Sequence, residues 1–280
     1  MIATSSRRLD QLLCILSFSA RFLNPATSFI IGNKIKDASR KSLSTRRMSL
    51  EVEQKFQITD STNLESKLKE LGFSSKGSAM IVDWYFDNDK NYLTTRDCWL
   101  RYREKGKAGQ WELKKGRGDQ GTTVYEELEG EQAYLAAASI LEEAALESTE
   151  IAKRDQETTL DGFQVPEIPL PKSYGLHPFC RLETKRSSWY TEASDSPYAG
   201  LSVDLDSTNT GHTVGEVEIV CDEAEVEIGK KRVQTLIMEL TGNDGSDSST
   251  TAVGKLEHFL LNNRPEHYAA CVASGVIGKQ

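Results

Sequence analysis

The sequence predicts an α+β protein of about eight antiparallel strands, arranged as a sheet or as a closed β-barrel with a polar lumen, and with helices packed outside. Three observations support this fold class. Short strand-like segments recur between clusters of Gly, Asn, Asp and Lys, as in an antiparallel sheet or barrel. Within these segments charged residues alternate with apolar ones, which gives each strand a charged face and an apolar face. Helical patterns between the strands supply apolar stripes to cover the apolar faces.

The first half of the body combines strands with two helices. Residues 61–71 place three leucines on one helical stripe, and Gly72 ends the pattern. Residues 131–147 also repeat apolar residues at helical spacing. The two stripes consist of Leu64, Leu68 and Leu71 in the first helix and of Leu135, Ala138, Leu141 and Ala145 in the second. The predicted strands are residues 50–58, 81–86, 98–104, 110–115 and 122–128.

A proline-rich link at Pro166, Pro169 and Pro171 separates the two halves. Residues 242–254 are rich in Gly, Ser, Asp and Thr and predict a mobile loop. A last helix is predicted at residues 255–262, with its apolar side chains as the buried face. The other predicted elements of this half are strands at residues 181–189, 201–205 and 214–220 and a helix at residues 227–240.

Charge is distributed unevenly along the 280 residues. Residues 1–48 hold nine basic and two acidic residues, whereas the rest of the chain holds 25 basic and 40 acidic residues, a net charge of −15. A body this acidic argues against nonspecific nucleic-acid binding, which depends on neutralising phosphates. We therefore expect no nucleic-acid partner.

The first 48 residues form a basic extension, rich in Ser and Arg, that we expect to be disordered or transit-like. A mitochondrial transit peptide, a cytosolic disordered tail and a secretory signal are the alternatives. The apolar run at residues 12–18 is too short to span a bilayer, so no membrane partner is expected. We expect a cytoplasmic protein, or a mitochondrial one if residues 1–48 are a cleaved transit peptide.

Cysteine and histidine usage does not indicate zinc. Five cysteines are scattered without a C-x-x-C pair, and four histidines lack H-E-x-x-H or related spacing. An odd cysteine count without metal-ligand spacing is most simply interpreted as belonging to a reduced intracellular compartment.

The most informative segment is the strand that carries Glu51, Glu53 and Lys55 on one face. Two carboxylates two positions apart on a strand repel each other unless a cation lies between them. Mg²⁺ fits this role, because it is a hard cation that binds carboxylate and phosphate oxygens. Taken alone, the same pattern also fits the solvated face of an ordinary antiparallel strand.

Charged faces of mixed sign recur on the other predicted strands. If these faces converge inside a closed barrel, they form a polar lumen, the reverse of the apolar interior usual in small barrels. Such a lumen suits a polyanion with a metal, since Arg and Lys hold phosphate oxygens and carboxylates hold Mg²⁺. The residues concerned are Trp99, Arg101, Arg103, Glu112, Lys114, Asp204, Asp206, Glu216 and Glu218.

With these motifs the sequence resembles the CYTH, or triphosphate tunnel metalloenzyme, superfamily, whose signature is E-x-E-x-K. Within it, the motifs resemble the enzymes that hydrolyse thiamine triphosphate. The resemblance covers residues 49–268, which we expect to form the catalytic domain, and leaves a C-terminal tail at residues 269–280. The other matching motifs are residues 99–104, 111–114, 184–189, 203–206 and 214–218, with Lys255-Leu256 and Arg264-Pro265.

The resemblance implies a role for each matched position. Carboxylates would bind Mg²⁺, basic residues would hold the triphosphate, and Trp99 would pack against the thiamine ring system, since indole is the best cation–π partner for a thiazolium. Glu53, Lys55 and Lys114 are the expected catalytic residues. The implied metal ligands are Glu51, Glu53, Asp204, Glu216 and Glu218, and the implied triphosphate ligands are Lys55, Arg101, Arg103, Lys114, Arg186 and Lys255. Asp206 and Glu127 are further candidates.

The implied function is a Mg²⁺-dependent hydrolase that converts thiamine triphosphate to thiamine diphosphate and phosphate. No Ser–His or Cys–His nucleophile motif is evident, so we expect direct attack by water. Two alternatives stay open. One is an enzyme of the same fold that hydrolyses tripolyphosphate or a nucleoside triphosphate, or cyclises ATP, and the other is a noncatalytic polyphosphate-binding module. We expect a monomer, because the chain's own helices cover the outside of the barrel.

Overall fold

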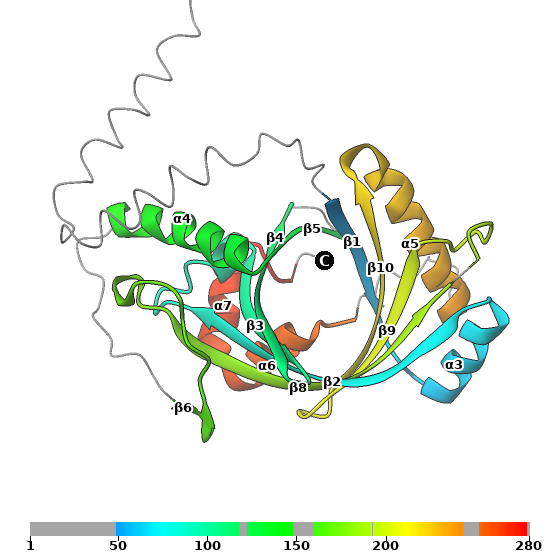
Figure 1. Ribbon diagram of the computed structural model, residues 1–280, viewed down its shortest axis with the longest axis horizontal. Coiled ribbons are helices and arrows are strands. Elements are labelled where there is room, and N and C mark those ends of the chain that lie inside the picture. Colours follow the sequence, from blue (N-terminus) through cyan, green and yellow to red (C-terminus); the bar gives the residue numbers. More distant parts are fainter. Residues whose placement is uncertain (1–48, 118–121, 148–158, 192, 243–251, 279–280) are drawn as a thin grey trace, which may run out of the picture. The chain divides into compact units, whose positions relative to one another are not determined.

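The predicted barrel is confirmed: eight antiparallel strands close on one another. The structure, a computed structural model, describes residues 49–117, 122–147, 159–191, 193–242 and 252–278. The barrel strands are β1 (Ser49–Phe56), β2 (Ser74–Asp87), β3 (Cys98–Lys105), β4 (Ala108–Gly116), β5 (Thr123–Glu129), β8 (His177–Tyr190), β9 (Leu201–Thr208) and β10 (Thr213–Asp222). Around the ring they follow the order β1-β10-β9-β8-β2-β3-β4-β5, and β5 pairs back with β1 (Figure 1).

Three helices cover the outside of this barrel. Helices α3 (Ser61–Glu70) and α5 (Val226–Thr241) lie on one side of the ring, and α4 (Glu131–Glu147) lies on the opposite side (Figure 1). Apolar side chains of β1, such as Leu50 and Val52, point outward and are buried with the leucines of α3 and α5. The alternation in β1 therefore separates a core under the helices from a charged lumen.

The buried face of α4 differs from the predicted one. Leu135 is 49% exposed, whereas Ala133, Ala137 and Leu141 are almost fully buried against β3 and β4. Alanines on the contact side let the helix backbone approach the sheet closely, so the small residues face inward and the larger Leu135 remains in solvent. The prediction of Leu135 as a core residue was wrong.

Strands β2 and β8 are longer than predicted. Both run for 14 residues and pair along their whole length, whereas the alternation predicted only residues 81–86 of β2. The first residues of β2, from Ser74 to Gly77, are polar and exposed, so they carry no apolar alternation. Their extended conformation depends on hydrogen bonds to β8, which the local sequence does not reveal.

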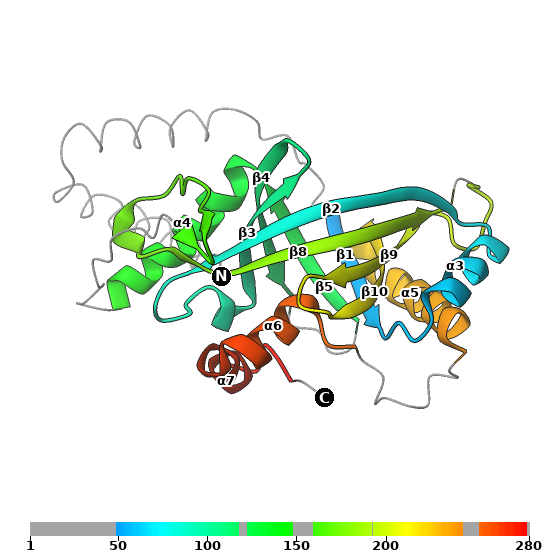
Figure 2. The same cartoon turned by 90° about the horizontal axis from the view of Figure 1, so that it is seen from below.

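The chain ends with two helices, of which only the first was predicted. Helix α6 (Lys255–Asn263) is followed by α7 (Pro265–Ala273), which begins with proline at its first turn. Leu260 and Cys271 from these helices are fully buried with Tyr85 and Leu182, which share the lumen-facing sides of β2 and β8 with Asp83 and Thr184. Figure 2 shows α6 and α7 together on one side of the barrel, away from α4 and α5. They cover one end of its inner surface, and the boundary expected at residue 268 falls inside α7.

The remaining described elements are short. They are the hairpin β6 (Thr159–Leu160) and β7 (Phe163–Gln164), and the 3₁₀ turns η2 (Thr94–Arg96), η3 (Lys172–Tyr174) and η4 (Glu223–Glu225). Within the described residues, none of the helices has the length and apolar character needed to cross a membrane. The predicted extension at residues 1–48 and most of the predicted loop at residues 242–254 lie outside the described residues.

Candidate active site in the barrel lumen

Opposite charges face each other across neighbouring strands of the lumen. Each of five cations lies directly opposite a carboxylate, so the positive charges are paired where the barrel buries them. The pairs include bidentate contacts: Arg103 donates from Nε and Nη2 to the two oxygens of Asp83, at 2.7 and 2.8 Å. The five cross-strand pairs are Lys55 with Glu216, Arg101 with Glu112, Arg103 with Asp83, Lys114 with Glu127 and Arg186 with Asp206.

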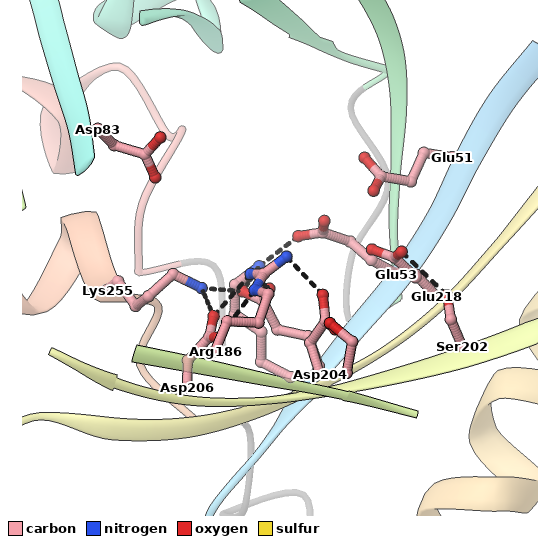
Figure 3. A network of polar contacts seen from close by, with 12 residues as sticks. Glu51, Glu53, Asp83, Arg186, Ser202, Asp204, Asp206, Glu218 and Lys255 are labelled. Atoms are coloured by element: carbon pink, nitrogen blue, oxygen red, sulfur yellow. Dashed lines mark hydrogen bonds and ion pairs between the residues drawn. The ribbon is translucent and has the colours of Figure 1, made fainter. Parts of the chain in front are cut away.

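Arg186 is the centre of a neutralised cluster near α6 (Figure 3). Its guanidinium donates to both oxygens of Asp206, at 2.8 and 2.6 Å, and to Glu216 at 3.0 Å, and it also pairs with Asp204. Lys255, at the start of α6, contacts two of these carboxylates, Asp206 and Glu216, and lies 2.8 Å from Glu216. Burial opposes the charge of Glu216, but Lys255, Lys55 and Arg186 outweigh it and hold the pKa of Glu216 well below its usual range.

A second group of carboxylates is short of positive charge. Glu53 lies directly opposite Glu218 across β1 and β10, and Glu51 joins them, with ligand oxygens all within 4.8 Å of one another. Lys114 donates to Glu51 and, at 2.9 Å, to Glu53, and Lys55 also donates to Glu53. Glu218 receives a hydrogen bond from the Ser202 hydroxyl at 3.0 Å. We call Glu51, Glu53 and Glu218 the acidic trio.

The electrostatics of the acidic trio fit a divalent cation. Burial opposes the charge of Glu53, but the ammonium groups of Lys114 and Lys55 prevail and hold its pKa at about 2. Burial and the neighbouring Glu51 and Asp204 raise the pKa of Glu218 to about 8. Three convergent carboxylates with too few counter-charges form a donor set suited to Mg²⁺, which prefers carboxylate oxygens. Asp204 and Glu216, also predicted as metal ligands, do not belong to the trio, because Arg186 and Lys255 occupy them.

Lys114 connects the acidic trio to the phosphate-binding face. It projects from β4 between Glu51 and Glu53, and its cross-strand neighbour is Glu127. Burial disfavours its charge, yet Glu53 and Glu51 raise the pKa of Lys114 well above its usual range. This side chain therefore supplies a fixed positive charge.

The charged residues line two adjacent cavities. The first has a volume of about 380 Å³ and is lined by every predicted site residue except Asp204. The second, of about 500 Å³, includes Asp204, and the two share Arg103, Arg186 and Glu218. Trp99 lies in the first cavity, where its indole N–H donates to Asp97 at 2.8 Å. The fold thus brings the predicted residues together around one passage.

Several lining residues were not predicted. Asp83 is 2% exposed and lies between apolar residues of β2, so a buried charge within an apolar run was the available signal. Tyr125 and Tyr85 also line the first cavity. Because tyrosine is common in barrel cores, nothing in the sequence around these two residues indicated that they line the cavity. Asp206 and Glu127, held as further candidates, both contact predicted cations.

The barrel and its lining define the class of protein: a tunnel enzyme for a phosphate chain. A closed antiparallel ring presents paired cations and unneutralised carboxylates to one narrow passage, which is the environment that a triphosphate with its metal requires. The CYTH domain model matches residues 49–251. The chain belongs to this family, and its class is that of the CYTH triphosphate tunnel hydrolases.

The chain is similar to known thiamine-triphosphatases. It is 30% identical to the human protein over 223 residues, which cover 78% of this chain and 87% of that one. The protein from Macaca fascicularis matches with the same identity and coverage. Among solved structures, a protein from Hippeastrum with a dominant triphosphatase activity matches with a TM-score of 0.41 and 15% identity, over 72% of this chain and 94% of that one.

Proposed function

We propose that this protein hydrolyses thiamine triphosphate to thiamine diphosphate and phosphate. The observation that carries the proposal is the position of Trp99, which shares a strand face and a cavity with Arg101 and Arg103. A cation–π platform beside a phosphate-binding passage suits a substrate that joins a thiazolium ring to a triphosphate. The similarity to human thiamine-triphosphatase supports the same substrate.

The chain's own residues suffice to bind and orient the triphosphate. Arg101, Arg103 and Arg186 present guanidinium groups that match phosphate oxygens in a bidentate manner. Each is held by a carboxylate, so its orientation is set before substrate arrives and little reorganisation is needed on binding. Lys55 and Lys255 add charge from β1 and α6.

The acidic trio would hold Mg²⁺. When bound there, the ion would neutralise phosphate oxygens and make a water molecule more acidic. Lys114, fixed between Glu51 and Glu53, supplies positive charge beside the same position. Because its pKa is raised, Lys114 stabilises developing negative charge as a cation rather than by releasing its proton.

A substrate panel tests the proposal directly. Phosphate release would be measured with Mg²⁺ from thiamine triphosphate, tripolyphosphate and ATP. We expect the highest kcat/KM for thiamine triphosphate, because only this substrate combines a triphosphate with a cationic ring for the indole. Activity on tripolyphosphate or ATP without activity on thiamine triphosphate would overturn the substrate assignment, and binding without turnover of all three would favour a noncatalytic module.

A further inference from the structure

We infer that Asp97 provides a counter-charge in the first cavity that selects phosphate chains attached to an organic cation. The inference rests on the proposed function, which it deepens by naming a residue that determines specificity. Asp97 lines the first cavity together with Trp99 and accepts the hydrogen bond from its indole N–H at 2.8 Å. The indole ring and a carboxylate are therefore held side by side in this cavity.

The backbone holds Asp97 in an unusual conformation. Its φ is +56°, in the left-handed region, directly after the turn η2, and its N–H donates to Thr94 O at 3.2 Å. Its own carbonyl accepts from Gly116 N at 2.8 Å. Left-handed conformations are costly for most residues, and Asp and Asn tolerate them best. The left-handed backbone at Asp97 costs conformational energy, and it places this carboxylate against the indole.

The close approach of β4 also depends on the position of Asp97. A Cβ atom added at Gly116 would lie 1.7 Å from Asp97 Oδ2, so only glycine leaves room for the carboxylate there. Two independent features, the left-handed backbone and the bare Cα of Gly116, therefore maintain the same side-chain position. This arrangement gives a second way to perturb the carboxylate without removing its charge.

The surroundings of Asp97 favour a charged ring over a phosphate. Trp99 packs with Leu256 and Val276 in the apolar cluster under α6 and α7, and these side chains line the same cavity. A positively charged aromatic ring gains from both the apolar wall and the carboxylate. A bare polyphosphate gains from neither and is repelled by the carboxylate. Adenine is neutral, so ATP does not gain the ionic contact.

Calorimetric titration of thiamine diphosphate and of pyrophosphate, both with Mg²⁺, tests the inference without depending on turnover. The measured quantity is the ratio of the two dissociation constants, pyrophosphate over thiamine diphosphate. Asp97→Asn keeps an oxygen acceptor for the indole and tolerates the left-handed backbone, but removes the charge. We expect the wild-type ratio to exceed ten and the variant to lower it about fivefold to tenfold, through weaker thiamine diphosphate binding.

Two further variants accompany this measurement. Glu126→Gln removes a carboxylate from the outer face of β5, where it lies 3.8 Å from Arg117, and should leave the ratio unchanged. Gly116→Ala should lower the ratio by displacing the Asp97 side chain while its charge remains. In turnover assays, Asp97→Asn should raise KM for thiamine triphosphate and leave kcat within about twofold of the wild-type value, since the residues that bind the phosphates are unchanged.

The results separate this inference from the proposed function. A wild-type ratio near one, a ratio unchanged by Asp97→Asn, or equal weakening of both ligands would overturn the role of Asp97. A high ratio that Asp97→Asn lowers, in an enzyme that does not hydrolyse thiamine triphosphate, would support Asp97 and contradict the proposed function alone.

Discussion

At two neighbouring positions in the lumen, carboxylates lie opposite each other across paired strands. The first position lies between β9 and β10, and the second lies between β10 and β1. Glu216 lies opposite Asp204, and Glu53 lies opposite Glu218. Like charges directly opposite each other destabilise a sheet unless a cation intervenes. At the first position Arg186 contacts both carboxylates, and Lys255 adds a second cation. At the second, Lys114 and Lys55 both contact Glu53, whereas Glu218 accepts from the Ser202 hydroxyl and forms no ion pair with any described residue.

Because the two positions have different counter-charges, one lumen can serve two purposes. The neutralised pair orients Arg186 and Lys255 for an anion, and its stability comes from the protein itself. The second pair, Glu53 and Glu218, forms the acidic trio with Glu51. These three carboxylates have too few counter-charges, and Mg²⁺ would supply the missing positive charge. The following predictions test whether the two positions differ in this way, beginning with the largest effect.

Removing a charge from the acidic trio should abolish most activity. Glu53→Gln keeps the size of the side chain but removes the carboxylate that lies between Lys55, Lys114 and Glu218. We expect turnover to fall about a thousandfold, because both the metal site and the position of Lys114 are affected. Steady-state phosphate release at saturating Mg²⁺ measures it, with Glu126→Gln as the control on the outer face of the barrel. Turnover within tenfold of the wild type would show that the trio is not the metal site.

Removing a charge from the neutralised cluster should instead damage stability. Asp206 is 1% exposed and accepts both hydrogen bonds of the Arg186 fork. Asp206→Asn removes the charge from the bidentate contact with Arg186 and from the contact with Lys255, so these two cations must share Asp204 and Glu216. We expect a loss of about 3 kcal/mol in the free energy of unfolding. Urea unfolding at neutral pH without ligand measures it. Glu183→Gln, on the outer side of neighbouring β8, is the control, and an equal effect of both substitutions would contradict the comparison.

Asp83 extends the neutralised cluster and predicts a pH dependence. Burial disfavours its charge, but Arg101 and Arg103 outweigh it and lower the pKa of Asp83 to about 2. Because the folded-state pKa is depressed, the stabilising contribution is complete above about pH 4 and is lost as the pH falls towards 2. Wild type should exceed Asp83→Asn by about 2 kcal/mol in unfolding free energy at pH 7.

Urea unfolding at pH 7, 4.5 and 3 measures the difference in unfolding free energy between wild type and Asp83→Asn. The difference should stay constant from pH 7 to 4.5 and shrink at pH 3. A difference that is the same at all three values would mean that the ionic pair with Arg103 does not contribute through its charge.

The smallest expected effect distinguishes the two sets of predicted metal ligands. Glu218→Gln should raise the Mg²⁺ concentration for half-maximal activity about tenfold, since it removes one of three converging ligands. Asp204→Asn, in the neutralised pair, should shift it less than about threefold. Activity measured across a Mg²⁺ titration for both variants decides between them. A larger shift for Asp204→Asn would return that residue to the metal site predicted from the family resemblance.

Much of this site could be predicted because strand alternation is a local property. The spacing of Glu51, Glu53 and Lys55 predicts that they share a strand face, whichever strands pair with theirs. The same rule grouped Trp99 with Arg101 and Arg103, and the structure places all six in one cavity. Lys255 was predicted as a site residue only from the family resemblance, since a single lysine at the start of a helix forms no pattern that indicates a site.

The amino-acid sequence was enough to predict the fold class, the charged face of each strand and a lumen that combines cations with carboxylates. Which carboxylate contacts which cation depends on the strand order around the barrel and on the register between strands, so it became known from the folded structure. The folded structure also added α7, which packs with α6 over the inner face of β2 and β8, and the contact of Asp97 with both Trp99 and Gly116. Alternation is fixed by neighbours along the chain, whereas charge neutralisation depends on residues brought together from distant strands.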